Sequence, residues 1–157
     1  MAVGNSNFFK NAHNKAELYY HSTSSWETKA SYPFQEAISS FEILAHSDSF
    51  ILFGGLYYDE KLSTGLDTTD IVAKFNPGSN RWTKLGKLQH NRHAFGVIEI
   101  DTKYLVMGGG PSGGGEMRTE TCVLENETIE CTSREPTLKG FWNPALMTVS
   151  SDYADNC

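Results

Sequence analysis

Two short apolar runs that end in paired glycines decide the fold: Phe50-Ile51-Leu52-Phe53-Gly54-Gly55 and Tyr104-Leu105-Val106-Met107-Gly108-Gly109. They lie 54 residues apart, counted from Gly54 to Gly108. A second landmark, an aromatic residue six or seven positions before a tryptophan, occurs at Tyr20 and Trp26 and again at Phe75 and Trp82. The two tryptophans are 56 residues apart. Two landmarks with nearly one period predict a repeat architecture.

Composition limits the classes of protein that this chain can represent. It has 157 residues, of which 39% are apolar and 20% charged, so we expect one packed globular domain. The net charge is −6 and lysine and arginine do not cluster, which argues against nucleic-acid binding. No apolar run is long enough to span a bilayer. The first ten residues lack the pattern of a signal peptide, so the protein is cytosolic or its true N-terminus lies elsewhere.

The residue pattern predicts a series of strand pairs, and it shows no sustained helical periodicity. Residues 1–16 are an irregular lead-in, and residues 151–157 are a tail. Turn-forming residues separate the predicted strands, and Asn76-Pro77-Gly78-Ser79-Asn80 is the clearest turn. A long polar loop is predicted at 56–69, and a last strand at 145–150. The predicted strand pairs are 17–20 with 26–28, 37–44 with 49–53, 70–75 with 82–85, 93–100 with 103–107, and 120–124 with 128–132.

An apolar run ending in Gly-Gly, followed by a loop and an aromatic shortly before a tryptophan, resembles the kelch repeat. The resemblance covers residues 17–150, with landmarks near 20–55, 75–109 and 120–150. It implies an all-β fold of about two and a half four-stranded antiparallel blades of a β-propeller. Arg92 resembles the family's arginine at the start of an innermost strand, but Ile38 takes that place one unit earlier, and Cys131 stands where the earlier hairpins have tryptophan. Because known propellers close with more blades, the missing ones come from a longer chain or from self-association.

The resemblance implies a protein–protein interaction module that binds a protein ligand with its loops. The loops after the inner strands, 56–69 and 109–119, would share one face of the disc. Tyr57 and Tyr58 in the first loop are candidate binding residues, and Arg92, at the start of an innermost strand, is a candidate near the central channel. For Arg92 the alternative is a structural hydrogen bond between blades.

Two other functions of kelch-like proteins remain alternatives. One is a ubiquitin-ligase adaptor that selects substrates inside the cell; the other is part of an extracellular enzyme similar to galactose oxidase. The sequence offers no convincing set of copper ligands, so we expect no enzyme, no cofactor and no metal site. Residues 108–113 match G-x-G-x-x-G, but a strand pattern follows where a dinucleotide site needs a helix. His90 and His93 are three apart, a spacing that points to opposite faces of a strand.

Cysteine usage bears on the compartment. A two-residue turn at Asn126-Glu127 would place Cys122 directly opposite Cys131, where a disulfide can form. Asn126-Glu127-Thr128 is also an N-glycosylation pattern at the predicted tip, and Cys157 is left over. These signs favour an extracellular protein, but free cysteines are also ordinary core residues. The sequence leaves extracellular and cytoplasmic locations open.

Overall fold

A computed structural model describes residues 1–3, 15–34, 38–113, 118–134 and 142–147. Within these residues the chain forms thirteen strands and no helix, which confirms the all-β prediction. The predicted lead-in and tail lie largely outside the described residues. Of the strand predicted at 145–150, residues 145–147 do not form a strand, and residues 148–150 lie outside the described part of the chain. The strands are β1 Ala2–Val3, β2 Ala16–Tyr20, β3 Ser25–Lys29, β4 Glu42–His46, β5 Ser49–Phe53, β6 Leu56–Tyr58, β7 Leu66–Thr68, β8 Ile71–Asn76, β9 Arg81–Lys87, β10 His93–Ile100, β11 Lys103–Gly110, β12 Thr119–Glu125 and β13 Thr128–Arg134.

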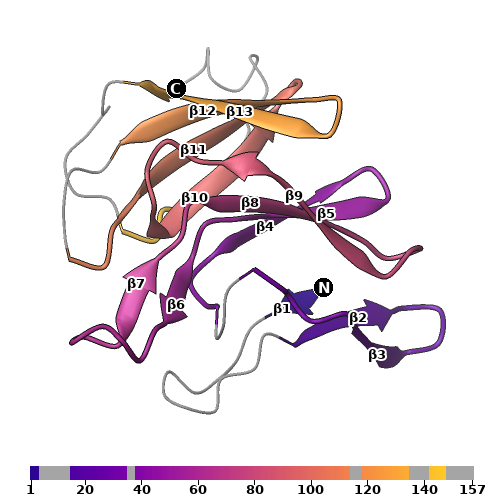
Figure 1. The fold of residues 1–157 in the computed structure, drawn as a ribbon. Helices are drawn as coiled ribbons and strands as arrows, with labels where there is room; N and C mark the ends of the chain where they lie inside the picture. Colours follow the sequence, from indigo (N-terminus) through magenta and orange to yellow (C-terminus); the bar gives the residue numbers. More distant parts are fainter. Residues whose placement is uncertain (4–14, 35–37, 114–117, 135–141, 148–157) are drawn as a thin grey trace.

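Eight of these strands form one sheet that nearly closes on itself (Figure 1). It consists of two antiparallel meanders: β4-β5-β8-β9, here the first meander, and β10-β11-β12-β13, the second meander. Their outer strands, β9 and β13, meet in a single parallel pair between Gly86 and Ile129. On the other side, the amide of Ala94, the second residue of β10, donates to the carbonyl of Ser40 before β4, 3.1 Å away.

Two small sheets flank the meanders. Strands β1, β2 and β3 form an N-terminal sheet, and β6 pairs with β7 in a hairpin that projects at the lower left of Figure 1. The region predicted as a long loop at 56–69 therefore contains a hairpin of its own. Its strands contain two tyrosines and a threonine, residue types that favour extended backbone, and Gly65 supplies the positive φ, 69°, for the return.

The buried core lies on both sides of the first meander. Between the two meanders, apolar side chains from both pack together, including Phe53, Phe95 and Tyr104. On the opposite face, Leu52 and Ala73 pack with Tyr32 and Ile38 from the segment that follows the N-terminal hairpin. Full burial of a side chain such as Phe53 contributes about 1.5–3 kcal/mol. Both faces of the first meander are therefore covered, as the continuous apolar run in β5 predicts.

Strand register aligns the two meanders row by row. In the first, Phe50 is opposite Phe75, which is opposite Trp82. In the second, Tyr104 is opposite Cys122, which is opposite Cys131. Since Phe50 and Tyr104 hold the same place before the paired glycines, Cys131 does occupy the tryptophan position, as the repeat predicts. A pair of cysteines thus replaces a pair of aromatic rings.

The N-terminal hairpin corrects one residue of the motif. Trp26 is opposite Tyr19, with ring centroids 5.3 Å apart, whereas Tyr20 is opposite Ser25. Side chains alternate along a strand, so a shift of one residue moves a ring to the other face. Tyr19, and not the predicted Tyr20, is therefore the counterpart of Phe75.

The hairpin of β12 and β13 has the predicted turn. Asn126 and Glu127 both have positive φ, 49° and 63°, as a two-residue type I′ turn requires. Cys122 and Cys131 face each other with Cα atoms 4.0 Å apart and form a disulfide bond. The predicted cross-strand pairing is confirmed.

Candidate functional site

The paired glycines bring the ends of β5 and β11 close to the start of β10. Gly54, Gly55, Gly108 and Gly109 all have positive φ. A Cβ at Gly54 would lie 2.8 Å from the carbonyl oxygen of Arg92, and one at Gly109 would overlap the carbonyl oxygen of His93. Both the backbone conformation and the lack of space exclude a side chain at these positions, which explains why the sequence has glycine there.

Arg92 is buried, with 1% of its surface exposed, and its guanidinium donates hydrogen bonds to backbone and side-chain oxygens. It donates to the carbonyls of Gly108 at 2.9 Å and Arg118 at 2.5 Å, and to Glu120 Oε1 at 2.6 Å. Burial lowers the pKa of the guanidinium, and the Glu120 carboxylate opposes that effect. Arg92 also belongs to the lining of one of the two surface hollows described below, so its predicted binding role stays a prediction. The alternative, a structural role, fits its buried position.

Glu120 is the partner that sequence analysis did not identify. Its carboxylate is fully buried and also accepts hydrogen bonds from the backbone amides of Gln89 and His90, at 2.7 and 3.1 Å. It lies within 4.8 Å of the sulfurs of Cys122 and Cys131. This cluster does not suit a metal ion, because the sulfurs are bonded to each other and the carboxylate is occupied. The sequence did contain one signal for this role: Glu120 is an acidic residue within a predicted strand.

The segment 89–92, held from below by Glu120, separates two surface hollows. One, of about 360 Å³, is lined by Tyr57, Thr68, Asp70 and the segment 89–91. The other, of about 300 Å³, is lined by the segment 90–92, Gly109, Gly110, Pro111 and Arg118. We call the pair the loop groove. Ser112 Oγ lies 3.4 Å from Asp67 Oδ1, so the two loops predicted to share one face do lie side by side.

Tyr57 and Tyr58 differ in their positions. Tyr57 is half-buried and lines the groove, and its hydroxyl donates to Asp67 Oδ2 at 3.3 Å. Burial, with the adjacent Asp67 carboxylate, raises the pKa of Tyr57, so its hydroxyl stays protonated. The ring of Tyr58 instead lies against Gly65, where a Cβ would be 2.8 Å from it. Tyr57 is therefore the better contact residue, and Tyr58 stabilises the hairpin.

His90, Asn91 and Arg118 are groove residues that the sequence did not single out. His90 Nε2 is 2.7 Å from Ser133 Oγ, and Asn91 Nδ2 donates to the carbonyl of Thr68 at 3.3 Å. Arg118 is exposed at the rim. Their polarity and loop positions gave no periodic signal. The groove so formed is polar, with hydrogen-bonding groups on both walls.

A second surface lies at the N-terminal hairpin. Trp82 packs edge-on against Tyr32, with centroids 5.1 Å apart, and its indole N–H donates to the carbonyl of Ala30 at 2.8 Å. Trp26, in the equivalent place, is 58% exposed and Tyr19 is 42% exposed.

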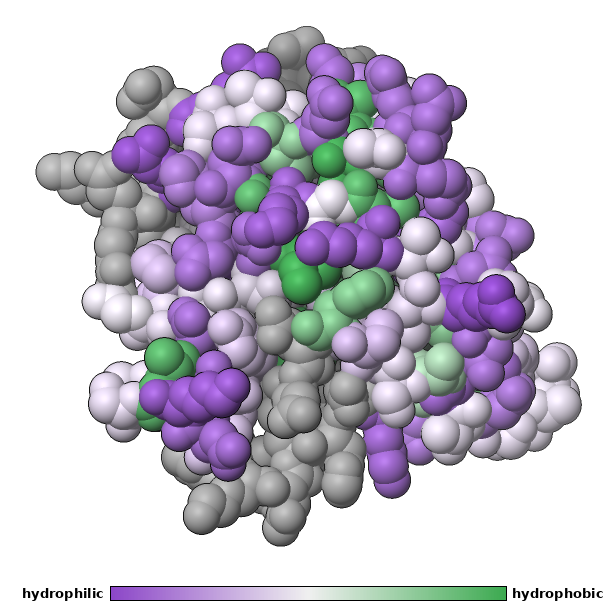
Figure 2. Space-filling view, viewed as in Figure 1, coloured by the Kyte–Doolittle hydropathy of each residue, from purple (hydrophilic) through white to green (hydrophobic). Residues whose placement is uncertain are grey.

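The face of the molecule shown in Figure 2 is mostly hydrophilic, with small apolar patches. Since the described residues contain no helix, none of them supplies a helix that could cross a membrane.

Comparison with known proteins identifies a fold but no family. No protein-family profile and no curated protein matches the sequence. A solved structure titled "Structure of YjhT" matches with a TM-score of 0.57 at 15% sequence identity. The match covers 73% of this chain and 43% of that chain. At this identity the likeness concerns the fold alone, and this chain corresponds to less than half of that protein's length.

Proposed function

We propose that the chain is part of a kelch-type β-propeller that binds another protein through the loop groove. Each meander is then a four-stranded blade, with β4 and β10 innermost. Ser40 precedes β4, Ala94 is the second residue of β10, and Asn143 lies about one repeat further along the chain; all three have positive φ, 49°, 54° and 49°. The Ala94 amide donates to Ser40, and the Asn143 amide donates to Ala94 at 2.8 Å. This repeated link supports a third blade that begins near residue 143.

The exposed Tyr19–Trp26 pair supports the idea that blades are missing. Its counterpart, Phe75–Trp82, is covered by the segment that follows the preceding hairpin. We infer that a preceding blade covers Trp26 in the same way, from a longer chain or from a second copy. Light scattering of the purified chain distinguishes these sources. If copies complete one another, the wild type is a discrete oligomer that Trp26→Glu dissociates; a wild-type monomer would exclude this route.

The groove carries the proposal of protein binding because it joins Tyr57 to two converging loops at one end of the sheet. A photo-crosslinking amino acid at position 57 tests it. The matched control position is Ile100, which is 43% exposed at the other end of β10. We expect position 57, and not position 100, to crosslink one discrete protein in the cells that make this chain. Equal labelling from both positions, or none from position 57, would contradict the proposal.

The disulfide favours an extracellular version of this function. Structural disulfides persist in oxidising compartments and are rare in the cytosol. An intracellular ubiquitin-ligase adaptor is therefore the weaker alternative. The galactose-oxidase-like alternative predicts bound copper, and elemental analysis of the complete protein would test it.

A further inference from the structure

We propose that Asn126 carries an N-linked glycan, a modification independent of ligand binding at the groove. Asn126-Glu127-Thr128 is the single N-x-Ser/Thr pattern in the sequence. The structure places it at the tip of the β12–β13 hairpin, where all three residues are exposed. A glycan needs such a position, because it is bulky and hydrated.

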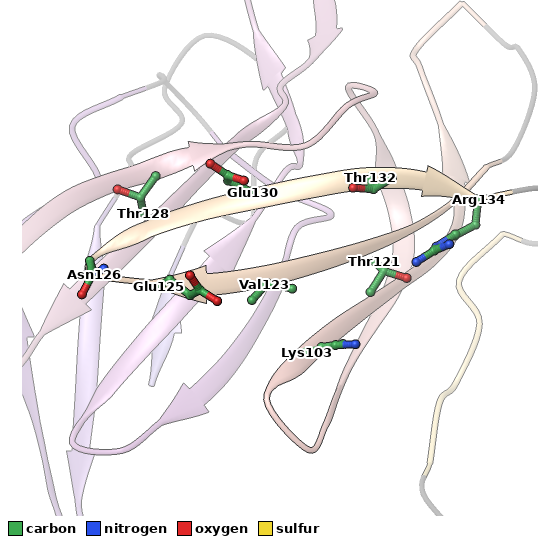
Figure 3. Close-up of a pocket in the computed structure, with 9 residues that line it drawn as sticks. All are labelled: Lys103, Thr121, Val123, Glu125, Asn126, Thr128, Glu130, Thr132 and Arg134. Carbon is green, nitrogen blue, oxygen red and sulfur yellow. The ribbon is translucent and has the colours of Figure 1, made fainter.

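The contact that the turn makes with the first meander comes from Glu127 and not from Asn126. Glu127 forms an ion pair with Lys74 of β8, so the second turn residue is held toward the first meander. Asn126 lies on the other side and borders a hollow over the outer half of the second meander (Figure 3). Its side chain makes no contact that a glycan would have to break among those seen in the described residues.

The part of this hollow nearest Asn126, at the outer tip of the hairpin, suits a carbohydrate, whereas the part farther along the strands faces the third blade that we propose. The hollow measures about 530 Å³, and its lining includes Thr121, Thr128, Thr132 and Glu130. Figure 3 shows these side chains along one side of the hairpin. Hydroxyl and carboxylate groups can exchange hydrogen bonds with sugar hydroxyls, and Val123 is the one aliphatic side chain in the lining. The inner strands of this meander instead meet Leu146, which lies against Gly96.

The same hairpin indicates a compartment in which the modification occurs. Its cross-strand disulfide, Cys122–Cys131, is of a kind that forms and persists in oxidising compartments such as the secretory route. N-glycosylation takes place in that route as well. A lipid-linked oligosaccharide pyrophosphate is the donor: a bond forms between Asn126 Nδ2 and C1 of the first N-acetylglucosamine, the C1–O bond to the pyrophosphate breaks, and the amide loses a proton.

Peptide mapping of the protein isolated from the cells that produce it tests the proposal. Peptide-N-glycosidase treatment in heavy-oxygen water converts a glycosylated Asn126 to labelled aspartate. We expect most copies to carry this label and to contain the Cys122–Cys131 disulfide. Recovery of unmodified Asn126 as the main species would overturn the proposal.

Matched variants in a secreting eukaryotic host show whether the folded tip accepts the glycan. Asn126→Gln and Thr128→Val destroy the pattern, whereas Thr128→Ser keeps it. We expect the glycosidase to shift the mobility of the wild type and Thr128→Ser but not of the other two. A secreted, disulfide-bonded wild type without a shift would contradict the proposal, whatever the groove binds.

Discussion

The buried ion pair between Arg92 and Glu120 gives the sharpest test of how this fold is held together. Glu120→Ala would leave a buried guanidinium without its counter-ion and two backbone amides, of Gln89 and His90, without an acceptor. Removal of one partner of a buried pair costs about 3–5 kcal/mol of unfolding free energy. Glu130→Ala, on the exposed side of β13, is the control and should change stability by less than about 0.5 kcal/mol.

The first meander suggests a double variant that should recover part of the lost stability. Its equivalents of Arg92 and Glu120 are Ile38 and Ala73, which share a buried apolar cluster. The double variant Arg92→Ile, Glu120→Ala copies that arrangement and removes both charges together. Replacement of a buried ion pair by apolar residues is often neutral or stabilising. Here the amides and carbonyls that the pair satisfied would still cost about 1–3 kcal/mol each where they stay buried without a partner.

Urea unfolding followed by tryptophan fluorescence measures both effects. We expect the double variant to be more stable than the sum of the two single variants predicts, by at least about 1 kcal/mol. Additive losses would show that the two side chains do not act as a pair. A loss below about 1 kcal/mol for Glu120→Ala alone would refute the reasoning from burial.

Three further outcomes are expected. Gly109→Ala should destabilise the protein by about 2 kcal/mol or more, because φ is +62° and the new Cβ overlaps the carbonyl of His93; Gly113→Ala, with no neighbour within 4 Å, is the control in the same urea assay. The double variant Cys122→Ser, Cys131→Ser should lower the unfolding free energy by about 2–3 kcal/mol, the value for so short a loop, and reduction of the wild type should match it in thermal melts. Burial raises the pKa of Tyr104 to about 12, whereas a tyrosine in the unfolded chain has a pKa of about 10. The protonated side chain therefore contributes its full stability below about pH 10, and this contribution is lost as the pH rises to about 12. Tyr104→Phe should flatten this part of the stability profile, and an unchanged profile would contradict the assignment.

Sequence analysis predicted the features that depend on local chemistry. The paired glycines, the strand pairs and the Asn126-Glu127 turn follow from backbone conformation and residue alternation, which nearby residues determine. The partner of Trp26 was predicted as Tyr20 and is Tyr19, because a shift of one residue changes the face of a strand and leaves the aromatic spacing almost intact. The Arg92–Glu120 pair was missed because its members are 28 residues apart and only the fold joins them.

The same pair connects the fold to the candidate site. Glu120 accepts hydrogen bonds from the amides of Gln89 and His90, so it fixes the backbone between the two hollows of the groove. Arg92 holds Glu120 in place and also binds the carbonyl of Arg118, at the far rim. A structural role for Arg92 therefore sets the spacing between His90 and Arg118 on the surface. Because of this arrangement, loss of Glu120 should impair partner crosslinking from position 57 even where the protein stays folded, whereas loss of the disulfide should affect stability first.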